Sequence, residues 1–115
     1  MTVVEKPLIW LGSARDDLRG FPPDARQVAG FQLWRVQHGL EPNDWKPMPS
    51  VGLGVREVRV HTRLEHRILY LARFEEAVYV LHAFEKRSQQ TPKRDLELAR
   101  QRLRELLKRR AQGRR

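Results

Sequence analysis

Basic residues recur in and beside segments that read as β-strands. Arg56 and Arg59 lie in the first segment, Arg67 lies in the second, and Lys86 and Arg87 directly follow the third. Because an unpaired buried guanidinium is costly, we expect these side chains to reach a sheet face or edge that is open to solvent or to a ligand. Cations gathered on such a surface would make contacts with the phosphates of a nucleic acid.

Strand alternation limits which of these cations can act together. Glu57 and Arg59 share one face of their strand, and Arg56 lies on the other. Arg56 and Arg59 therefore meet one ligand only if a bulge or the end of the strand redirects one of them. The residues alone equally allow a simpler interpretation, in which the arginines are solvated and pair weakly with neighbouring glutamates.

Aromatic residues accompany the arginines. Tyr70, Tyr79 and Phe84 lie in the same strand segments, and an aromatic ring beside arginines commonly holds single-stranded RNA by stacking and phosphate contacts. For Phe84 the apolar neighbours favour a place in the core over stacking on RNA.

The histidines allow two further kinds of chemistry. His61, His66 and His82 fall on or beside strands, where a histidine can act as a general acid or base or bind a metal. Their spacing matches no zinc motif, so structural roles are favoured. The sequence also has no glycine-rich phosphate loop, serine nucleophile motif or metalloprotease motif. It therefore predicts neither a metal nor a cofactor.

Hydrophobic patterning predicts the elements that position these residues. A strand over 7–11 is followed by a short helix capped by Ser13 and by a longer helix from Pro22-Pro23 to Gly39. Residues 39–54 read as a surface loop. The strands are expected at 55–62, 66–74 and 77–84, and the last helix begins after an N-cap at Thr91.

The predicted order is β-α-α-β-β-β-α, an α+β domain with a single antiparallel sheet. Two N-terminal helices and one C-terminal helix pack on that sheet. If the helices cover one face, the other face is free to form a basic floor.

Length and charge narrow the class of protein. A chain of 115 residues predicts one domain over 1–115, with residues 111–115 as a frayed basic tail. Residues 1–85 contain 11 basic and 11 acidic residues, so the net charge of +9 lies wholly in residues 86–115. Such a segment attracts nucleic acid phosphates, an anionic membrane surface or an acidic protein. The lack of cysteine excludes disulfides and thiolate chemistry. No signal peptide or membrane-spanning run is recognisable, so we expect a cytoplasmic protein.

Three segments resemble a known family. Residues 80–92 are similar to the last strand, polar linker and Thr-Pro helix start of HigB-like toxins in the RelE/ParE superfamily. Residues 54–59 and 66–70 resemble the two arginine-bearing strands of that family, and the likeness extends over about residues 7–108. The sequence departs from the pattern at Glu85, where a neutral residue is usual, and at Arg87, which replaces a lysine.

The resemblance implies a metal-independent endoribonuclease of a type II toxin–antitoxin system. It would cleave mRNA at the ribosome and be inhibited by a helix-turn-helix antitoxin, with no membrane partner. The residues implied in catalysis are Arg56, Arg59, Arg67, Lys86 and Arg87, and those implied in RNA binding are Tyr70, Phe84, Lys93 and Arg94. Two alternatives share the expected fold: a ParE-type toxin that binds DNA gyrase without cleaving RNA, and a phage-derived module that only binds nucleic acid or protein.

Overall fold

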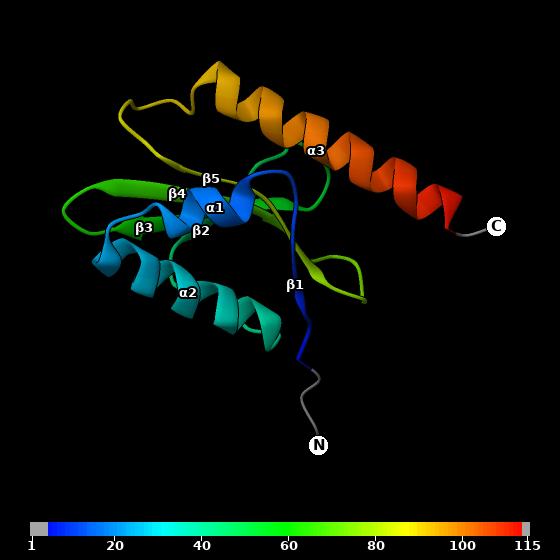
Figure 1. Cartoon of the computed structure of the whole chain (residues 1–115), viewed down its shortest axis with the longest axis horizontal. Helices are drawn as coiled ribbons and strands as arrows, with labels where there is room; N and C mark the ends of the chain where they lie inside the picture. Colours follow the sequence, from blue (N-terminus) through cyan, green and yellow to red (C-terminus); the bar gives the residue numbers. More distant parts are fainter. Residues whose placement is uncertain (1–4, 114–115) are drawn as a thin grey trace.

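A computed structural model describes residues 5–113 as one five-stranded sheet with three helices. The elements are β1 (Leu8–Trp10), α1 (Ala14–Arg19), α2 (Pro23–Gln37), β2 (Trp45–Pro47), β3 (Val55–His61), β4 (Glu65–Leu71), β5 (Val78–Glu85) and α3 (Lys93–Gln112). The strand order is β1-β5-β4-β3-β2. Figure 1 shows the sheet between α3 on one side and α1 with α2 on the other. The predicted α+β class is confirmed.

The three long strands form the predicted antiparallel meander, rich in the β-branched and aromatic residues that strands favour. The sheet as a whole is mixed, because β1 pairs parallel with β5. The prediction of a purely antiparallel sheet was therefore wrong at this edge. A register shift opposite Leu69 and Tyr70 leaves Leu81 as an extra residue in β5. As a result, both Leu81 and His82 contact the side of the sheet that carries α3.

Two hydrophobic cores lie on the two faces of the sheet. On the α2 face, Leu33 and Val36 of α2 pack against Val58, Val60 and Ile68. On the α3 face, the core is formed by buried residues from α3, from the sheet and from the 48–51 segment, including Leu69, Leu71, Leu81, Leu103 and Leu106. Helices therefore cover both faces, so the condition for an open basic face, helices on one face only, is not met.

The ends of α2 follow the sequence closely. Proline is tolerated at the first helical position, and the helix begins at Pro23. It ends in a left-handed Gly39 with φ of 78°. The Leu40 N–H donates to the Arg35 carbonyl and the Gly39 N–H to the Val36 carbonyl, which is the Schellman arrangement of a helix end.

Several local expectations were wrong. The predicted loop over 39–54 contains β2, which pairs with β3 at the edge of the sheet. Ser13 is the N-cap residue of α1, as expected, but its hydroxyl donates to the Asp17 carboxylate and makes no capping hydrogen bond to the helix backbone. The N-cap of α3 is Pro92, and the Thr91 hydroxyl donates to Glu57 instead. The helix α3 continues to Gln112, so the part of the expected frayed tail at 111–112 is helical, while Arg114 and Arg115 lie outside the described residues.

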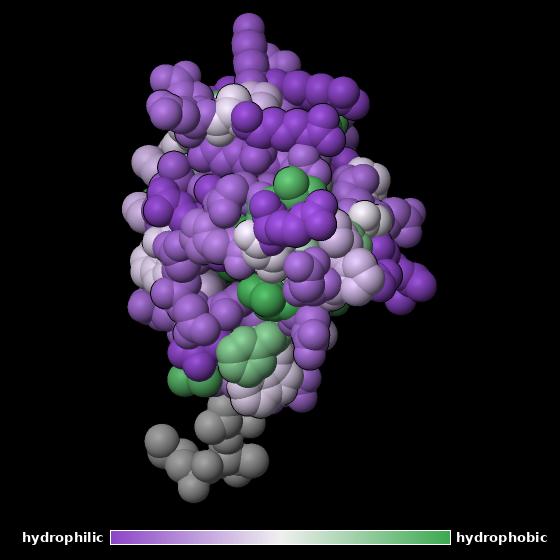
Figure 2. Space-filling model, turned by 90° about the vertical axis from the view of Figure 1, so that its left-hand side faces the viewer, coloured by the Kyte–Doolittle hydropathy of each residue, from purple (hydrophilic) through white to green (hydrophobic). Residues whose placement is uncertain are grey.

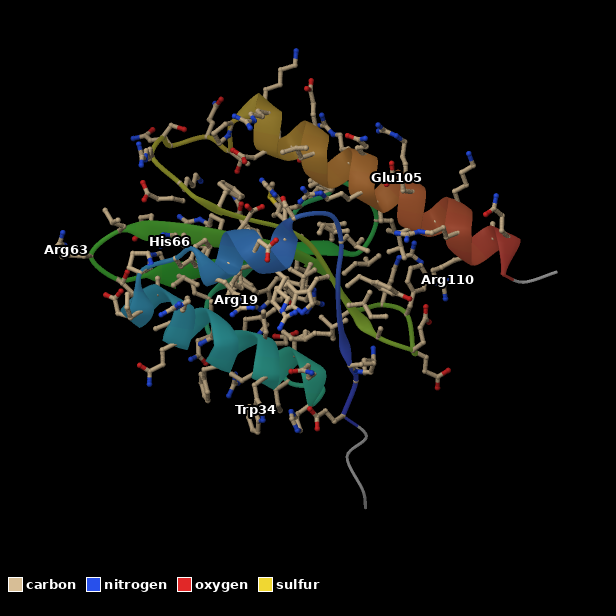
Figure 3. The ribbon with its side chains drawn as sticks, viewed as in Figure 1. Arg19, Trp34, Arg63, His66, Glu105 and Arg110 are labelled. Atoms are coloured by element: carbon tan, nitrogen blue, oxygen red, sulfur yellow. The ribbon has the colours of Figure 1, made fainter. Side chains whose placement is uncertain are left out.

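The side of the molecule that carries the β3–β4 hairpin is mainly hydrophilic, with only scattered apolar residues on its surface (Figure 2). Figure 3 shows Arg63 projecting from the tip of that hairpin and Trp34 pointing away from the sheet. Over residues 5–113, the structure holds no helix with the length and apolar character required to cross a membrane.

Candidate functional site: a cationic cluster around Glu57

Three basic side chains lie within 4.0 Å of the carboxylate of Glu57, and a fourth, Lys86, interacts with it electrostatically. Lys46 comes from β2, Arg59 from β3, Arg67 from β4, and Lys86 directly follows β5. The register explains the grouping, since Lys46 pairs with Glu57 and Arg59 pairs with Arg67 across neighbouring strands. We call these four cations, with Glu57 at their centre, the cationic cluster.

The ion pairs converge on one oxygen of Glu57. Lys46 Nζ and Arg67 Nε each lie 3.7 Å from Glu57 Oε1, and Arg59 Nε lies 4.0 Å from it. The second oxygen, Oε2, accepts a hydrogen bond of 3.3 Å from the Thr91 hydroxyl. The carboxylate is fully buried, whereas the side chains of Arg59 and Lys46 are 35% and 38% exposed. The cluster is therefore anchored inside the protein and opens to solvent on one side.

The cluster carries unused hydrogen-bonding capacity. Glu57 Oε1, Arg59 Nε and Arg67 Nε are buried, yet none has a hydrogen-bond partner among residues 5–113. Buried polar atoms without partners are rare in proteins because each costs free energy. Glu57, together with Glu65 and Asp44, balances part of the charge of the four cations, and the unpartnered N–H groups of Arg59 and Arg67 favour a bound anion.

Lys86 is suited to giving up a proton. Burial lowers the pKa of Lys86; Glu57 opposes this effect, and the positive charges of Arg67, Lys46 and Arg59 reinforce it. The backbone N–H of Lys86 donates to the Glu65 carbonyl at 2.7 Å, which fixes the residue beside β4. An ammonium group with a lowered pKa is a better general acid near neutral pH than an ordinary lysine.

A ring of acidic groups surrounds the exposed side of the cluster. Glu65 Oε1 accepts a hydrogen bond of 3.0 Å from Arg67, and Asp44 lies 3.9 Å from Arg59. His61 bridges these two carboxylates, with its ring nitrogens 2.5 Å from Asp44 and 2.7 Å from Glu65. Hydrogen bonds to Asp44 and then to Glu65 raise the pKa of His61. His61 thus competes with the two arginines for these acids.

The structure separates Arg56 and Tyr70 from the cluster. They are partners across β3 and β4 on the α2 face, opposite the face of Glu57. Arg56 lies 3.8 Å from Glu41 and stacks over the Trp45 ring at 4.0 Å. Tyr70 is almost wholly buried, and burial raises the pKa of its hydroxyl. The register of β3 is continuous, without a bulge that would redirect Arg56, so the structure does not bring Arg56 and Tyr70 together with the other predicted site residues.

The remaining predicted residues lie around the cluster. Phe84 is in the α3-face core, as favoured from its neighbours, and its ring stacks on His82 at 5.2 Å. Arg87 is 85% exposed and pairs with Glu85, so the two departures from the family pattern compensate each other. Lys93 and Arg94 are exposed in the first turn of α3, with Lys93 3.8 Å from Glu97.

Sequence reasoning missed three members of the site. Glu57 was correctly placed on the face of Arg59, but it was considered only as a surface ion-pair partner. Lys46 fell in a segment expected to be a loop, and nothing local indicates that this segment pairs with β3. Thr91 was expected to cap α3, which is the commoner use of a threonine before Pro. The one signal in the sequence that could have identified Glu57 is that strand alternation places it on the same face as Arg59.

One of the buried histidines, His82, serves the structure beside the cluster. His82 Nε2 contacts Asp95 of α3 at 2.6 Å, and Arg102 donates to His82 Nδ1 at 3.1 Å. Because Arg102 can only donate, Nδ1 accepts and Nε2 carries the proton given to Asp95. This network holds the first half of α3 against β5. Among the described residues, no three histidine or carboxylate side chains are placed to hold a metal ion.

Comparison with known proteins identifies the family. The family model described as "Phage derived protein Gp49-like (DUF891)" matches residues 16–104. No curated protein matches the sequence significantly. The matched range begins in α1, ends in α3 and contains every residue of the cationic cluster. The chain therefore belongs to the Gp49-like family of phage-derived proteins, within the RelE/ParE-like toxin superfamily.

Proposed function

We propose that the protein is the toxin of a type II toxin–antitoxin system in the HigB-like branch, and that it cleaves mRNA on the ribosome until an antitoxin binds it. The observation that carries the proposal is the cationic cluster, in which buried guanidinium N–H groups have no partner among residues 5–113. Membership of the toxin superfamily and the similarity of residues 80–92 to HigB-like toxins support the same conclusion.

The proposed reaction is attack of a ribose 2′-OH on the adjacent phosphate. A bond forms between the 2′ oxygen and phosphorus, the bond to the 5′ oxygen breaks, and a cyclic phosphate and a 5′-OH end result. Arg59 and Arg67 would bind the phosphate oxygens and stabilise the charge of the transition state. Lys86 would protonate the leaving 5′ oxygen, while the proton of the 2′-OH passes to water.

Glu57 has a positioning role in this proposal. It holds Lys46, Arg59 and Arg67 at distances of 3.7–4.0 Å, too long for direct hydrogen bonds. The cations are therefore gathered before RNA arrives without being fully neutralised. This preorganisation avoids reorganisation at the moment of reaction.

The test is inducible expression in bacteria with mapping of mRNA 5′ ends. Lys86→Ala is expected to lower the number of new cleavage ends by about a hundredfold, as for loss of a general acid. Arg63→Ala is the matched control, because Arg63 is exposed at the hairpin tip outside the cluster. Growth arrest with intact mRNA would contradict the proposed nuclease activity and favour a toxin that binds gyrase. Normal growth would favour a module that only binds nucleic acid or protein.

A further inference from the structure

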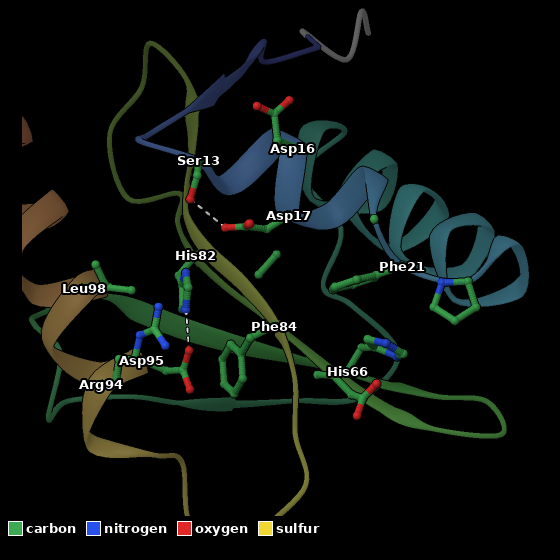
Figure 4. A pocket seen from close by; sticks show the side chains of 14 residues that line it. Ser13, Asp16, Asp17, Phe21, His66, His82, Phe84, Arg94, Asp95 and Leu98 are labelled. Atoms are coloured by element: carbon green, nitrogen blue, oxygen red, sulfur yellow. Dashed lines mark hydrogen bonds and ion pairs between the residues drawn. The ribbon is translucent and has the colours of Figure 1, made fainter.

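A cavity with no member of the cationic cluster in its lining lies at the β5 edge of the sheet. It has a volume of about 550 Å³ and is bounded by α1, the first turns of α3 and the second half of β5. Figure 4 shows Phe21, Phe84 and Leu98 on its walls, with Asp17 and Asp95 extending toward it from opposite sides. The walls therefore combine an apolar floor with carboxylates.

The rim of this cavity is acidic, in contrast to the chain as a whole. Asp16, Asp17, Glu85 and Asp95 line it with a single basic residue, Arg94. Asp17 accepts a hydrogen bond of 2.7 Å from the Ser13 hydroxyl, Asp95 is bound to His82 through one oxygen, and Glu85 is paired through one oxygen with the exposed Arg87. Each of these carboxylates keeps further lone pairs for a ligand. Such a rim repels phosphate and attracts a cation.

A buried histidine adds an independent observation. His66 is only 1% exposed, lines the same cavity and packs against the Phe21 ring with centroids 4.2 Å apart. Its Nδ1 is buried and has no hydrogen-bond partner among residues 5–113. Burial lowers the pKa of His66, so the ring is neutral at physiological pH. Buried polar atoms without partners are rare, so His66 Nδ1 is a hydrogen-bonding group beside the cavity that no described residue satisfies.

The edge of the sheet is also open at this point. β1 pairs with β5 only along Leu8–Trp10, and the Leu81 carbonyl accepts a hydrogen bond from Arg102. Since the Lys86 N–H points to β4, alternation directs the backbone groups of Ala83 and Glu85 outward, into the cavity. No described residue binds these outward groups. An unpaired edge is a template for an extended peptide.

We propose that the cavity binds an arginine side chain presented by an extended segment of a partner protein. The backbone of that segment would pair with Ala83 and Glu85, and its guanidinium would bind the carboxylates of Asp17, Glu85 and Asp95. Arginine fits better than lysine because its planar fork binds carboxylates through two hydrogen bonds and stacks on aromatic rings such as Phe84. This site does not depend on the RNA chemistry of the cationic cluster.

The probe is the capped peptide acetyl-Val-Arg-Val-methylamide, titrated into the full chain. Binding is followed by NMR of the Ala83 and Glu85 backbone amides and of the His66 ring nitrogens. The matched peptide replaces arginine with citrulline, which keeps the shape and removes the charge. We expect the citrulline peptide to bind at least about tenfold more weakly, as for loss of one charge-assisted contact.

Variants of the protein test whether the arginine of the peptide binds the carboxylates of the cavity. The double variant Asp17→Asn/Glu85→Gln is expected to bind the arginine peptide at least about tenfold more weakly than the parent chain. The control Glu75→Gln/Glu105→Gln makes the same charge change at exposed residues outside the cavity and should bind normally. If the double variant does not fold, Glu85→Gln alone serves, with an expected weakening of about threefold or more.

Three results would overturn the proposal. The first is no shift of these signals up to about 5 mM peptide. The second is equal binding of the arginine and citrulline peptides. The third is an RNA dinucleotide that shifts the same signals when the arginine peptide does not, which would make the cavity a site for a base. Because no arm of this test measures RNA cleavage, its failure is distinct from failure of the proposed nuclease.

Discussion

The two faces of one sheet are built from different chemistry. The α2 face is filled by apolar side chains along its length, among them Val58, Val60 and Ile68. The α3 face is apolar at the Leu71 and Leu103 end, but at the other end it contains the cationic cluster around a fully buried Glu57. Successive residues of β3 and β4 alternate between these faces. The same strands therefore supply both the stability of the fold and the candidate site.

The difference between the two faces shows where a small domain tolerates buried charged side chains. α3 and its packed residues close only part of their face, and Arg59 and Lys46 reach solvent beyond the apolar part. The carboxylate of Glu57 repays part of the desolvation cost of Arg67, whose side chain is only 9% exposed. The two buried charged groups, Glu57 and Arg67, therefore lie beside the linker that precedes α3, where the helix no longer covers the sheet.

The largest predicted effect is removal of the central carboxylate. Glu57→Gln should lower the free energy of unfolding by about 3–5 kcal/mol, because Arg67 then loses its buried counter-ion and keeps only the partly exposed Glu65 as an opposite charge. Urea denaturation measures this change. Replacing Arg67 in the same chain, as Glu57→Gln/Arg67→Gln, should recover part of the loss. A loss of less than about 1 kcal/mol for Glu57→Gln would mean that the carboxylate does not hold the cluster together.

On the opposite face, Leu33→Ala tests the apolar core. Leu33 is 1% exposed in α2, and the truncation should cost about 2–4 kcal/mol through lost burial and a residual cavity. RNA cleavage per folded molecule should not change. Leu53→Ala is the control, since Leu53 is 80% exposed and its truncation should leave denaturation unaffected. Lost cleavage in a fully folded Leu33→Ala protein would mean that the faces are coupled.

Two arginines three residues apart in one strand give the sharpest comparison of function. Arg59→Ala should lower RNA cleavage by about a hundredfold, or about 2.7 kcal/mol in the barrier, because it removes a charge from the cluster. Arg56→Ala should leave cleavage within about twofold, because Arg56 lies on the α2 face beside Trp45. Equal losses in the two variants, measured on purified protein, would refute the assignment of the site to one face.

The smallest effect concerns His61 at the edge of the cluster. Its pKa is raised above 6.5 in the folded protein, so its contribution to stability is complete below pH 6.5 and is lost as pH rises through the raised pKa. The pKa of Glu65 is lowered below 4.5, chiefly by the hydrogen bond to His61. The contribution of Glu65 to stability is therefore lost as pH falls through that lowered pKa. His61→Asn should therefore be less stable than the parent chain at about pH 5.5 and similar to it at about pH 9. Thermal unfolding at both pH values provides the measurement, and a pH-independent difference would contradict this reasoning.

The sequence predicted the long elements because their signals are local. The meander over β3, β4 and β5 follows from β-branched and aromatic runs with short connections, and the end of α2 follows from Gly39. β2 was missed because Trp45–Pro47 is a short segment among prolines and glycines. Its strand conformation comes from pairing with β3, which is a tertiary effect.

The candidate site was predicted in part for the same reason. Alternation correctly separated Arg56 from Glu57 and Arg59. It gave no account of Lys46, whose position depends on the unrecognised β2, or of Thr91, which approaches Glu57 only through the path of the linker before α3. The acidic cavity was also beyond the sequence, because its walls come from α1, β5 and α3.

The parallel pairing of β1 with β5 has a consequence for the order in which the chain acquires its shape. Closing a long loop carries an entropic cost, so this contact is expected to form after the local hairpins of β3, β4 and β5. Synthesis proceeds from the N-terminus, and β1 emerges long before its partner. Lys86 and α3 emerge last of all the parts that complete the cluster. A chain still being made therefore carries an unfinished site until Lys86 has been added, and the positively charged segment 86–115 follows the balanced residues 1–85.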